Sequence, residues 1–205
     1  MLFEITEFIG IASFTLSGFY IAIRNRLDIL GIFISSFLTA LGGGIIRDTI
    51  AGVAPISLVT LKPMFIVLFM IALLITLGFH KKQQYDKKPL FVFIDSIGLV
   101  SFSIAGALVA LEQNFSLSGV IILAFVTAVG GGILRDILIN VVPYVLKGGF
   151  YGIISILIGI AIYQLNLISY LNFYTILVVF IVSIILRMFA FKQNWELPNI
   201  YKTKG

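Results

Sequence analysis

Two short segments place glycines and charged residues together inside long apolar stretches. Gly42–Asp48 (GGGIIRD) is followed 88 positions later, counting from 42 to 130, by Gly130–Asp136 (GGGILRD). An ionisable side chain in apolar surroundings is costly unless it is paired, and it is a functional candidate by default. Glycine costs about 1 kcal/mol against alanine in a helix. Because both the glycines and the charged residues are unfavourable here, their repetition predicts that they form a structural or functional site.

Other kinds of chemistry find little support in the composition. The chain has no cysteine and a single histidine, His80, which stands beside lysines in a predicted surface loop. Disulfides and thiolate chemistry are excluded, and the sequence shows no nucleotide loop, metal-ligand cluster or nucleophile–base pair. We expect no catalysis, no bound metal and no cofactor; the small molecules expected at the site are a permeant K⁺ or Na⁺ and bound lipid.

The elements that must position these residues are transmembrane helices. Hydrophobic residues make up 60% of the 205 positions and charged residues 11%, with a mean hydropathy of +1.14, whereas soluble domains carry about a quarter charged residues. Apolar runs of about 20 residues indicate membrane-spanning helices, and the alternation typical of a β-barrel is missing. We predict an all-α polytopic membrane protein with seven spans: Thr6–Ile23, Ile29–Ala51, Pro63–Phe79, Leu90–Leu111, Leu117–Ile139, Gly148–Leu165 and Phe173–Phe191.

The basic residues lie mostly on one side of these predicted spans. Twelve of the 14 lysines and arginines fall in the first, third and fifth loops and the tail, and only Arg47 and Lys62 fall on the other side. Cytoplasmic loops are enriched in basic residues, so we predict the cell membrane as the location, the N-terminus outside and the C-terminus in the cytoplasm. The net charge of +5 is then a property of cytoplasmic loops, and no nucleic-acid partner is expected.

The chain contains an internal duplication. Shifting it by 88 positions (from 2 to 90) aligns 2–58 with 90–146 without a gap, and more than a third of the aligned residues are identical. We assign 2–79 and 90–165 as two three-helix repeats, 173–191 as a seventh helix and 192–205 as a cytoplasmic tail. Three spans per repeat force the second copy into the opposite orientation, an arrangement found in many transporters.

The glycine triplets allow two interpretations. They could break the second and fifth spans, so that unwound carbonyls of Gly42, Gly43, Gly44, Gly130, Gly131 and Gly132 replace the hydration shell of a monovalent cation. They could instead only allow close helix packing. Because two triplets occur in inverted copies, each before an Arg-Asp pair, we expect the break.

Charged and hydroxyl residues near the triplets are the remaining candidates. We predict ion pairs Glu7–Arg47 and Asp95–Arg135, which either join helices or gate two mouths, with Asp48 and Asp136 beside them. A polar path would use the hydroxyls of Ser13, Ser17, Thr39, Ser101, Ser103 and Thr127, although such groups often bond their own backbone. Lys62 and Lys147 are predicted at a mouth or at lipid headgroups.

The paired GGG-I-[IL]-R-D motifs, with Gly10, Ser13, Phe14 and Gly18 before the first and Pro55 after it, resemble a known family. It is the prokaryotic branch of the trimeric intracellular cation (TRIC) channels, which overlaps the bacterial proteins with a duplicated glycine transporter domain. The resemblance implies a 3+3+1 helix fold and a homotrimer in which each protomer has its own K⁺ or Na⁺ pore. The family favours an acidic residue at Asp28 and at its counterpart, Ser116, and aspartate at Glu7, so one mouth departs from the pattern.

Three functions follow as hypotheses. The first is a monovalent-cation channel with a pore in each protomer at the glycine motifs. The second is a secondary transporter of a small solute such as glycine, which would use the same motifs as a binding site. The third, a purely structural membrane protein, is disfavoured by the predicted broken helices.

Overall fold

The computed structural model describes residues 1–79, 88–147, 150–195 and 197. The predicted loop around His80 and most of the predicted tail lie outside these residues. The described part of the chain contains helices and no strand. In chain order the helices are α1 (Leu2–Arg24), α2 (Ile29–Ile50), α3 (Ile56–Val59), α4 (Lys62–Thr76), α5 (Lys88–Glu112), α6 (Leu117–Leu138), α7 (Tyr144–Lys147), α8 (Tyr151–Leu167) and α9 (Phe173–Lys192).

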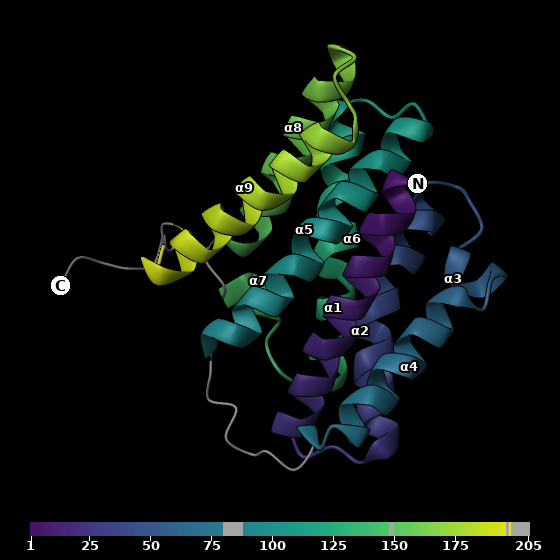
Figure 1. The fold of residues 1–205 in the computed structure, drawn as a ribbon, viewed down its shortest axis with the longest axis vertical. Helices are drawn as coiled ribbons and strands as arrows, with labels where there is room; N and C mark the ends of the chain where they lie inside the picture. Colours follow the sequence, from purple (N-terminus) through teal and green to yellow (C-terminus); the bar gives the residue numbers. More distant parts are fainter. Residues whose placement is uncertain (80–87, 148–149, 196, 198–205) are drawn as a thin grey trace.

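Four helices form the centre of the bundle. α1 packs against α5 and α2, and α6 packs against α2 and α5. α3 and α4 lie on one flank of this group, and α8 and α9 lie on the other (Figure 1). The first and second repeats therefore share one core, since the most extensive contacts join helices from different repeats.

Five of the described helices are long and apolar enough to cross a membrane: α1, α2, α5, α6 and α9. The helices α4 and α8 are apolar but shorter. The all-α class and the multi-pass membrane character are thus confirmed, whereas the count of seven spans stays a prediction. The share of the apolar window that is buried falls from 83% in α5 to 22% in α9, so α5 is central and α9 peripheral.

Local signals explain where the helices begin and end. The Asp28 carboxylate accepts a hydrogen bond from the Gly31 amide at 2.7 Å and so caps α2. Asn172 and Thr175 form a capping box at the start of α9. After α4, Gly78 has a φ of +73°, a conformation that ends helices and stops α4 before the predicted limit at Phe79.

The glycine triplets do not break their helices, so this prediction is wrong. α2 is continuous through Gly42–Gly44, and α6 is continuous through Gly130–Gly132. A Cβ atom on Gly43 would collide with the Thr127 carbonyl of α6, and one on Gly131 would collide with the Thr39 carbonyl of α2. The glycines are needed because the two backbones touch where α2 and α6 cross, which is the packing interpretation.

This contact is reciprocal, as is a second one between α1 and α5. Gly10 lies against the Phe102 ring, and Gly98 lies against the Phe14 ring; the two rings pack edge to face, 5.2 Å apart at 79°. Reciprocal contacts between equivalent residues are the property of a twofold axis. The two repeats are therefore related by a pseudo-twofold axis that passes between α1 and α5 and between α2 and α6.

Candidate functional site: two ionic sites and a cavity

The first ionic site joins α1 to α2, and we call Glu7, Arg47 and Asp48 the Glu7 site. The Arg47 guanidinium donates to both Glu7 carboxylate oxygens, at 2.6 and 3.3 Å, and to Asp48 Oδ1 at 2.7 Å. It also lies 4.9 Å from the centre of the Phe3 ring. Arg47 is 0% exposed, and the predicted Glu7–Arg47 ion pair is confirmed.

The aspartate of each motif also holds the start of a short helix. Asp48 Oδ2 accepts from the Ile56 amide of α3 at 3.0 Å, and Asp136 Oδ2 accepts from the Tyr144 amide of α7 at 2.9 Å. These amides are at helix N-termini, where no intrahelical acceptor is available. Each aspartate therefore holds its arginine with one carboxylate oxygen and the start of the next helix with the other.

The second ionic site differs from the first. We call Asp95, Arg135 and Asp136, together with Ser17, the Asp95 site. Arg135 binds Asp136 Oδ1 at 2.8 Å. The predicted direct pair between Asp95 and Arg135 is not formed among the described residues. The Ser17 hydroxyl lies between them: it donates to Asp95 Oδ1 at 2.8 Å and accepts from Arg135 Nη1 at 3.3 Å.

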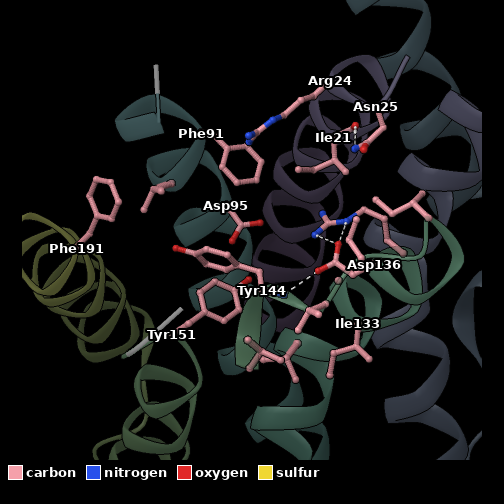
Figure 2. A pocket seen from close by; sticks show the side chains of 18 residues that line it. Ile21, Arg24, Asn25, Phe91, Asp95, Ile133, Asp136, Tyr144, Tyr151 and Phe191 are labelled. Carbon is pink, nitrogen blue, oxygen red and sulfur yellow. Dashed lines mark hydrogen bonds and ion pairs between the residues drawn. The ribbon is translucent and has the colours of Figure 1, made fainter. Parts of the chain in front are cut away.

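A cavity of about 480 Å³ opens beside the Asp95 site. Charged side chains of α1, α5 and α6 line it, as do aromatic side chains that include Phe91, Tyr144 and Tyr151 (Figure 2). The third glycine of the second triplet, Gly132, is part of the lining. The cavity is large enough to hold several water molecules, each of which occupies about 30 Å³ in the liquid.

Arg187 is a residue of this region that the sequence interpretation missed. It belongs to α9, is only 2% exposed, donates to the Tyr144 hydroxyl at 3.2 Å and lies 5.2 Å from the Tyr151 ring centre. Its Nε has no hydrogen-bond partner within the described part of the chain. An arginine inside an apolar span is a signal for a site, but the sequence interpretation counts it only among the basic residues of the cytoplasmic side.

The predicted polar path divides into two groups. Thr39, Thr127 and Ser103 donate to backbone carbonyls four residues earlier in their own helices, at 2.6, 2.6 and 2.7 Å, as hydroxyls in helices often do. Ser101 is buried and its hydroxyl has no partner among the residues that the structure describes, and Ser13 is also buried. Of the six, Ser17 is the one that joins an ionic site.

Each of the two predicted mouth lysines lies at one end of a helix. Lys62 is exposed at the beginning of α4. Lys147 is the last residue of α7, and its side chain is outside the described part of the structure. A role in binding lipid stays a prediction for both.

This chain is similar to known membrane proteins along nearly its whole length. The family model described as "Glycine transporter" matches twice, at residues 4–81 and 92–166. The UPF0126 membrane protein YvgT of Bacillus subtilis (strain 168) is 35% identical over 199 residues, which are 97% of this chain and 96% of that protein. The UPF0126 inner membrane protein YadS of Escherichia coli (strain K12) is 27% identical over 94% of this chain and 93% of its own length.

Solved structures with the same fold are cation channels. A TRIC cation channel studied for its conductance superimposes with a TM-score of 0.84 at 31% identity, over 100% of both chains. A prokaryotic TRIC channel crystallised in 0.5 M KCl gives a TM-score of 0.86 at 30% identity, over 96% of this chain and 99% of its own. The chain belongs to the glycine transporter family, which here overlaps the prokaryotic TRIC channel family.

Proposed function

We propose that this protein is a monovalent-cation channel with one conduction pathway in each protomer. The observation that carries the proposal is the whole-chain match to TRIC cation channels, at 30–31% identity and TM-scores of 0.84 and 0.86. This likeness to channels also supports a role other than catalysis. The permeant ion would be K⁺ or Na⁺.

The pathway that we propose runs from the cavity at the Asp95 site, past the crossing of α2 and α6, to the Glu7 site. Gly132 lines the cavity, and a Cβ on Gly44 would lie 3.5 Å from Glu7 Oε1, so the third glycine of each triplet faces an ionic site. The glycines contribute here through their small size, with their helices intact.

Buried carboxylates along this route offer a passing cation groups to interact with, and Arg24 also lines the cavity. Among the described residues, four buried carboxylates (Glu7, Asp48, Asp95 and Asp136) accompany three buried arginines (Arg47, Arg135 and Arg187). Acidic side chains along a pore select cations. Of these four, Asp95 is the carboxylate that reaches its arginine only through a hydroxyl, and it is the one that we expect to interact with a passing ion.

The proposed assembly is a homotrimer in the cell membrane. A TRIC orthologue from Rhodobacter sphaeroides, whose TM-score is 0.85 at 25% identity over 94% of this chain and 98% of its own, is described as trimeric. Exposed apolar side chains cover the outer faces of α4 and α9, including Phe65, Phe69, Val178 and Val182, and would contact lipid or a neighbouring protomer. The mass of the purified complex, measured by native mass spectrometry, would test this assembly.

A carrier for a small solute such as glycine is the second candidate, because the matching family model carries the description "Glycine transporter". Its pathway would use the same cavity as a binding site. In such a carrier, the two ionic sites would open alternately, one to each side of the membrane.

Recording from planar bilayers with a K⁺ gradient separates the two candidates. A channel gives discrete current steps that reverse near the K⁺ equilibrium potential, and Asp95→Asn is expected to reduce the single-channel conductance several-fold. Glu112→Gln, which removes an exposed carboxylate from the other end of α5, should leave the conductance unchanged. Silent bilayers, together with saturable glycine uptake into liposomes of the same preparation, would instead establish a carrier.

A further inference from the structure

The two ionic sites are built from equivalent residues but have different geometries. Shifting by 88 positions (from 7 to 95) relates Glu7 to Asp95, and the same shift relates Arg47 to Arg135. In the Glu7 site the acid and the arginine bind each other directly at 2.6 Å. In the Asp95 site a hydroxyl separates them, and a cavity of about 480 Å³ lies beside them. Glu7 is one methylene longer than Asp95 and so reaches its arginine more easily, and residues outside these pairs differ as well.

The first such difference is Ser17. Its counterpart in the second repeat (17 to 105) is Ala105, and both residues are completely buried. The Ser17 hydroxyl satisfies Asp95 and Arg135 at the same time, so that each charge has a polar partner without direct contact. The Ala105 methyl can neither donate nor accept a hydrogen bond, so it cannot separate an acid from an arginine in the same way.

The second difference lies one helical turn further along α1. Tyr20 corresponds to Leu108 (20 to 108). The Tyr20 ring stacks on Phe91 with centroids 4.8 Å apart, and Phe91 lines the cavity. The counterpart of Phe91, Phe3 (91 to 3), instead lies against the Arg47 guanidinium at 4.9 Å. Residues three apart share one face of a helix, so Ser17 and Tyr20 act on the same side of α1.

We propose that Ser17, supported by Tyr20, keeps Asp95 and Arg135 apart, so that the cavity beside them stays open to water. Ala105 and Leu108, at the equivalent positions, allow Glu7 and Arg47 to bind each other directly. In this conformation the pathway is shut at the Glu7 site. Ser17 is a positioning residue, because it acts by setting the distance between Asp95 and Arg135. The proposal rests on the proposed function only in placing both sites on a conduction pathway.

The physical argument concerns buried charges. A buried charge that loses its partner is strongly unfavourable. The Tyr151 side chain also interacts with Asp95, but Ser17 is the group that links Asp95 to Arg135. Without the Ser17 hydroxyl, we expect Asp95 to move toward Arg135 and form the direct pair that Glu7 forms with Arg47. In the opposite exchange, a hydroxyl at position 105 would offer Glu7 and Arg47 an alternative partner and loosen their direct contact.

Because the chain has no cysteine, the accessibility of each ionic site to water can be measured with a single introduced thiol. Ile133→Cys places a thiol in the cavity lining, and Ile45→Cys places one at the equivalent position of the first repeat. The rates of reaction with a charged methanethiosulfonate reagent are measured on the full-length protein in detergent. We expect Ile133→Cys to react at least tenfold faster than Ile45→Cys.

The two exchanges are then introduced separately. Ser17→Ala should slow the reaction of Ile133→Cys at least fivefold, and Ala105→Ser should accelerate that of Ile45→Cys at least fivefold. The matched controls are Ser103→Ala, which removes a buried hydroxyl bonded to its own helix at 2.7 Å, and Ala107→Ser, which adds one at another fully buried position of α5. Both controls should leave the two rates within twofold of the parent.

Unchanged rates in monodisperse Ser17→Ala protein would overturn the proposal, since water would then have replaced the hydroxyl without closing the cavity. Ala105→Ser tests the same idea through an added atom, so failure of one variant to fold does not remove the test. If the rates shift as expected while bilayers stay silent, the positioning role of Ser17 holds and the channel function fails. If currents appear while the rates stay unshifted, the channel function holds and the positioning role fails.

Discussion

At the scale of single residues, the buried arginines are the groups on which both ionic sites depend. Arg47 has no exposed surface and divides its hydrogen bonds between Glu7 and Asp48. Removing one partner of a buried pair costs about 3–5 kcal/mol, because the remaining charge stays away from water. The Glu7 site is therefore a structural joint between α1 and α2 as well as the proposed barrier to ions.

Glu7→Ala is expected to lower the free energy of unfolding by about 3 kcal/mol, near the lower end of that range because Asp48 still partners Arg47. Thermal unfolding in detergent measures the change. The control is Glu4→Ala, since Glu4 is exposed and its ion pair, at 3.5 Å, is with the N-terminus; it should alter stability by less than about 0.5 kcal/mol.

The double variant E7R/R47E sharpens this test. It should be more stable than either single reversal, because an acid and an arginine again face each other. Recovery should be incomplete, since Asp48 would then lie beside a carboxylate. A double variant no better than both single ones would mean that the Glu7–Arg47 contact contributes nothing.

Residue patterns predicted one site well and the other only in part. The duplication and the predicted topology placed Glu7 near Arg47, and that pair is present. The same reasoning failed for Asp95 and Arg135, because Asp95 is one methylene shorter than Glu7 and Ser17, from the other repeat, lies between it and Arg135. Arg187 escaped notice for a related reason: its partners are the Tyr144 hydroxyl and the Tyr151 ring, and no complementary charge in the sequence points to it.

At the scale of helices, the crossing of α2 and α6 is the most constrained contact in the core. The Gly43 backbone lies against the Thr127 carbonyl, and the Gly131 backbone lies against the Thr39 carbonyl. The neighbouring Gly44 and Gly132 have more room: an added Cβ would have its nearest neighbours at 3.5 and 3.8 Å. Adjacent glycines of one triplet therefore have different roles.

Gly43→Ala and Gly131→Ala should each lower the free energy of unfolding by at least about 1–3 kcal/mol, because the methyl group would push two backbones apart. Gly44→Ala and Gly132→Ala should be tolerated, since alanine favours the helix by about 1 kcal/mol and its methyl makes ordinary contacts. Thermal unfolding of the four variants gives the comparison. Equal effects at positions 43 and 44 would contradict the backbone contact.

Helix positions were largely predictable, and the state of the triplets was not. Apolar length and the Asp28 cap predict α2 to within one residue of its end at Ile50. Whether three glycines break a helix or admit a neighbour depends on the backbone of that neighbour, which belongs to the other repeat and is distant in the chain. Local propensity favoured the break, and the tertiary contact with α6 decided against it.

At the scale of the whole molecule, the two repeats share a core but differ at their flanks. α9 has no counterpart in the first repeat, and it brings Arg187 into contact with Tyr144, which lines the cavity beside the Asp95 site. The basic residues are also unevenly distributed, and this predicts the orientation in the membrane. The side on which each ionic site opens follows from that orientation.

Single cysteines can establish the orientation, because the chain has none of its own. Lys62→Cys, at the exposed start of α4, should react with a membrane-impermeant maleimide on intact cells. Lys204→Cys should react only after the cells are permeabilised. The opposite pattern would place the N-terminus in the cytoplasm and reverse the assignment of the two mouths.

The backbone contact between α2 and α6 also has a geometric consequence. Fourteen residues separate Gly43 from Ile29, a distance of about 21 Å along the helix, and four residues, or about 6 Å, separate it from Arg47. A tilt of about 5° around the crossing would move the start of α2 by about 2 Å and the Arg47 backbone by only about 0.5 Å. No side chains interlock at Gly43 and Gly131. Such a tilt would therefore change the distance between α2 and α6 on both sides of the crossing while the contact at the crossing itself is kept.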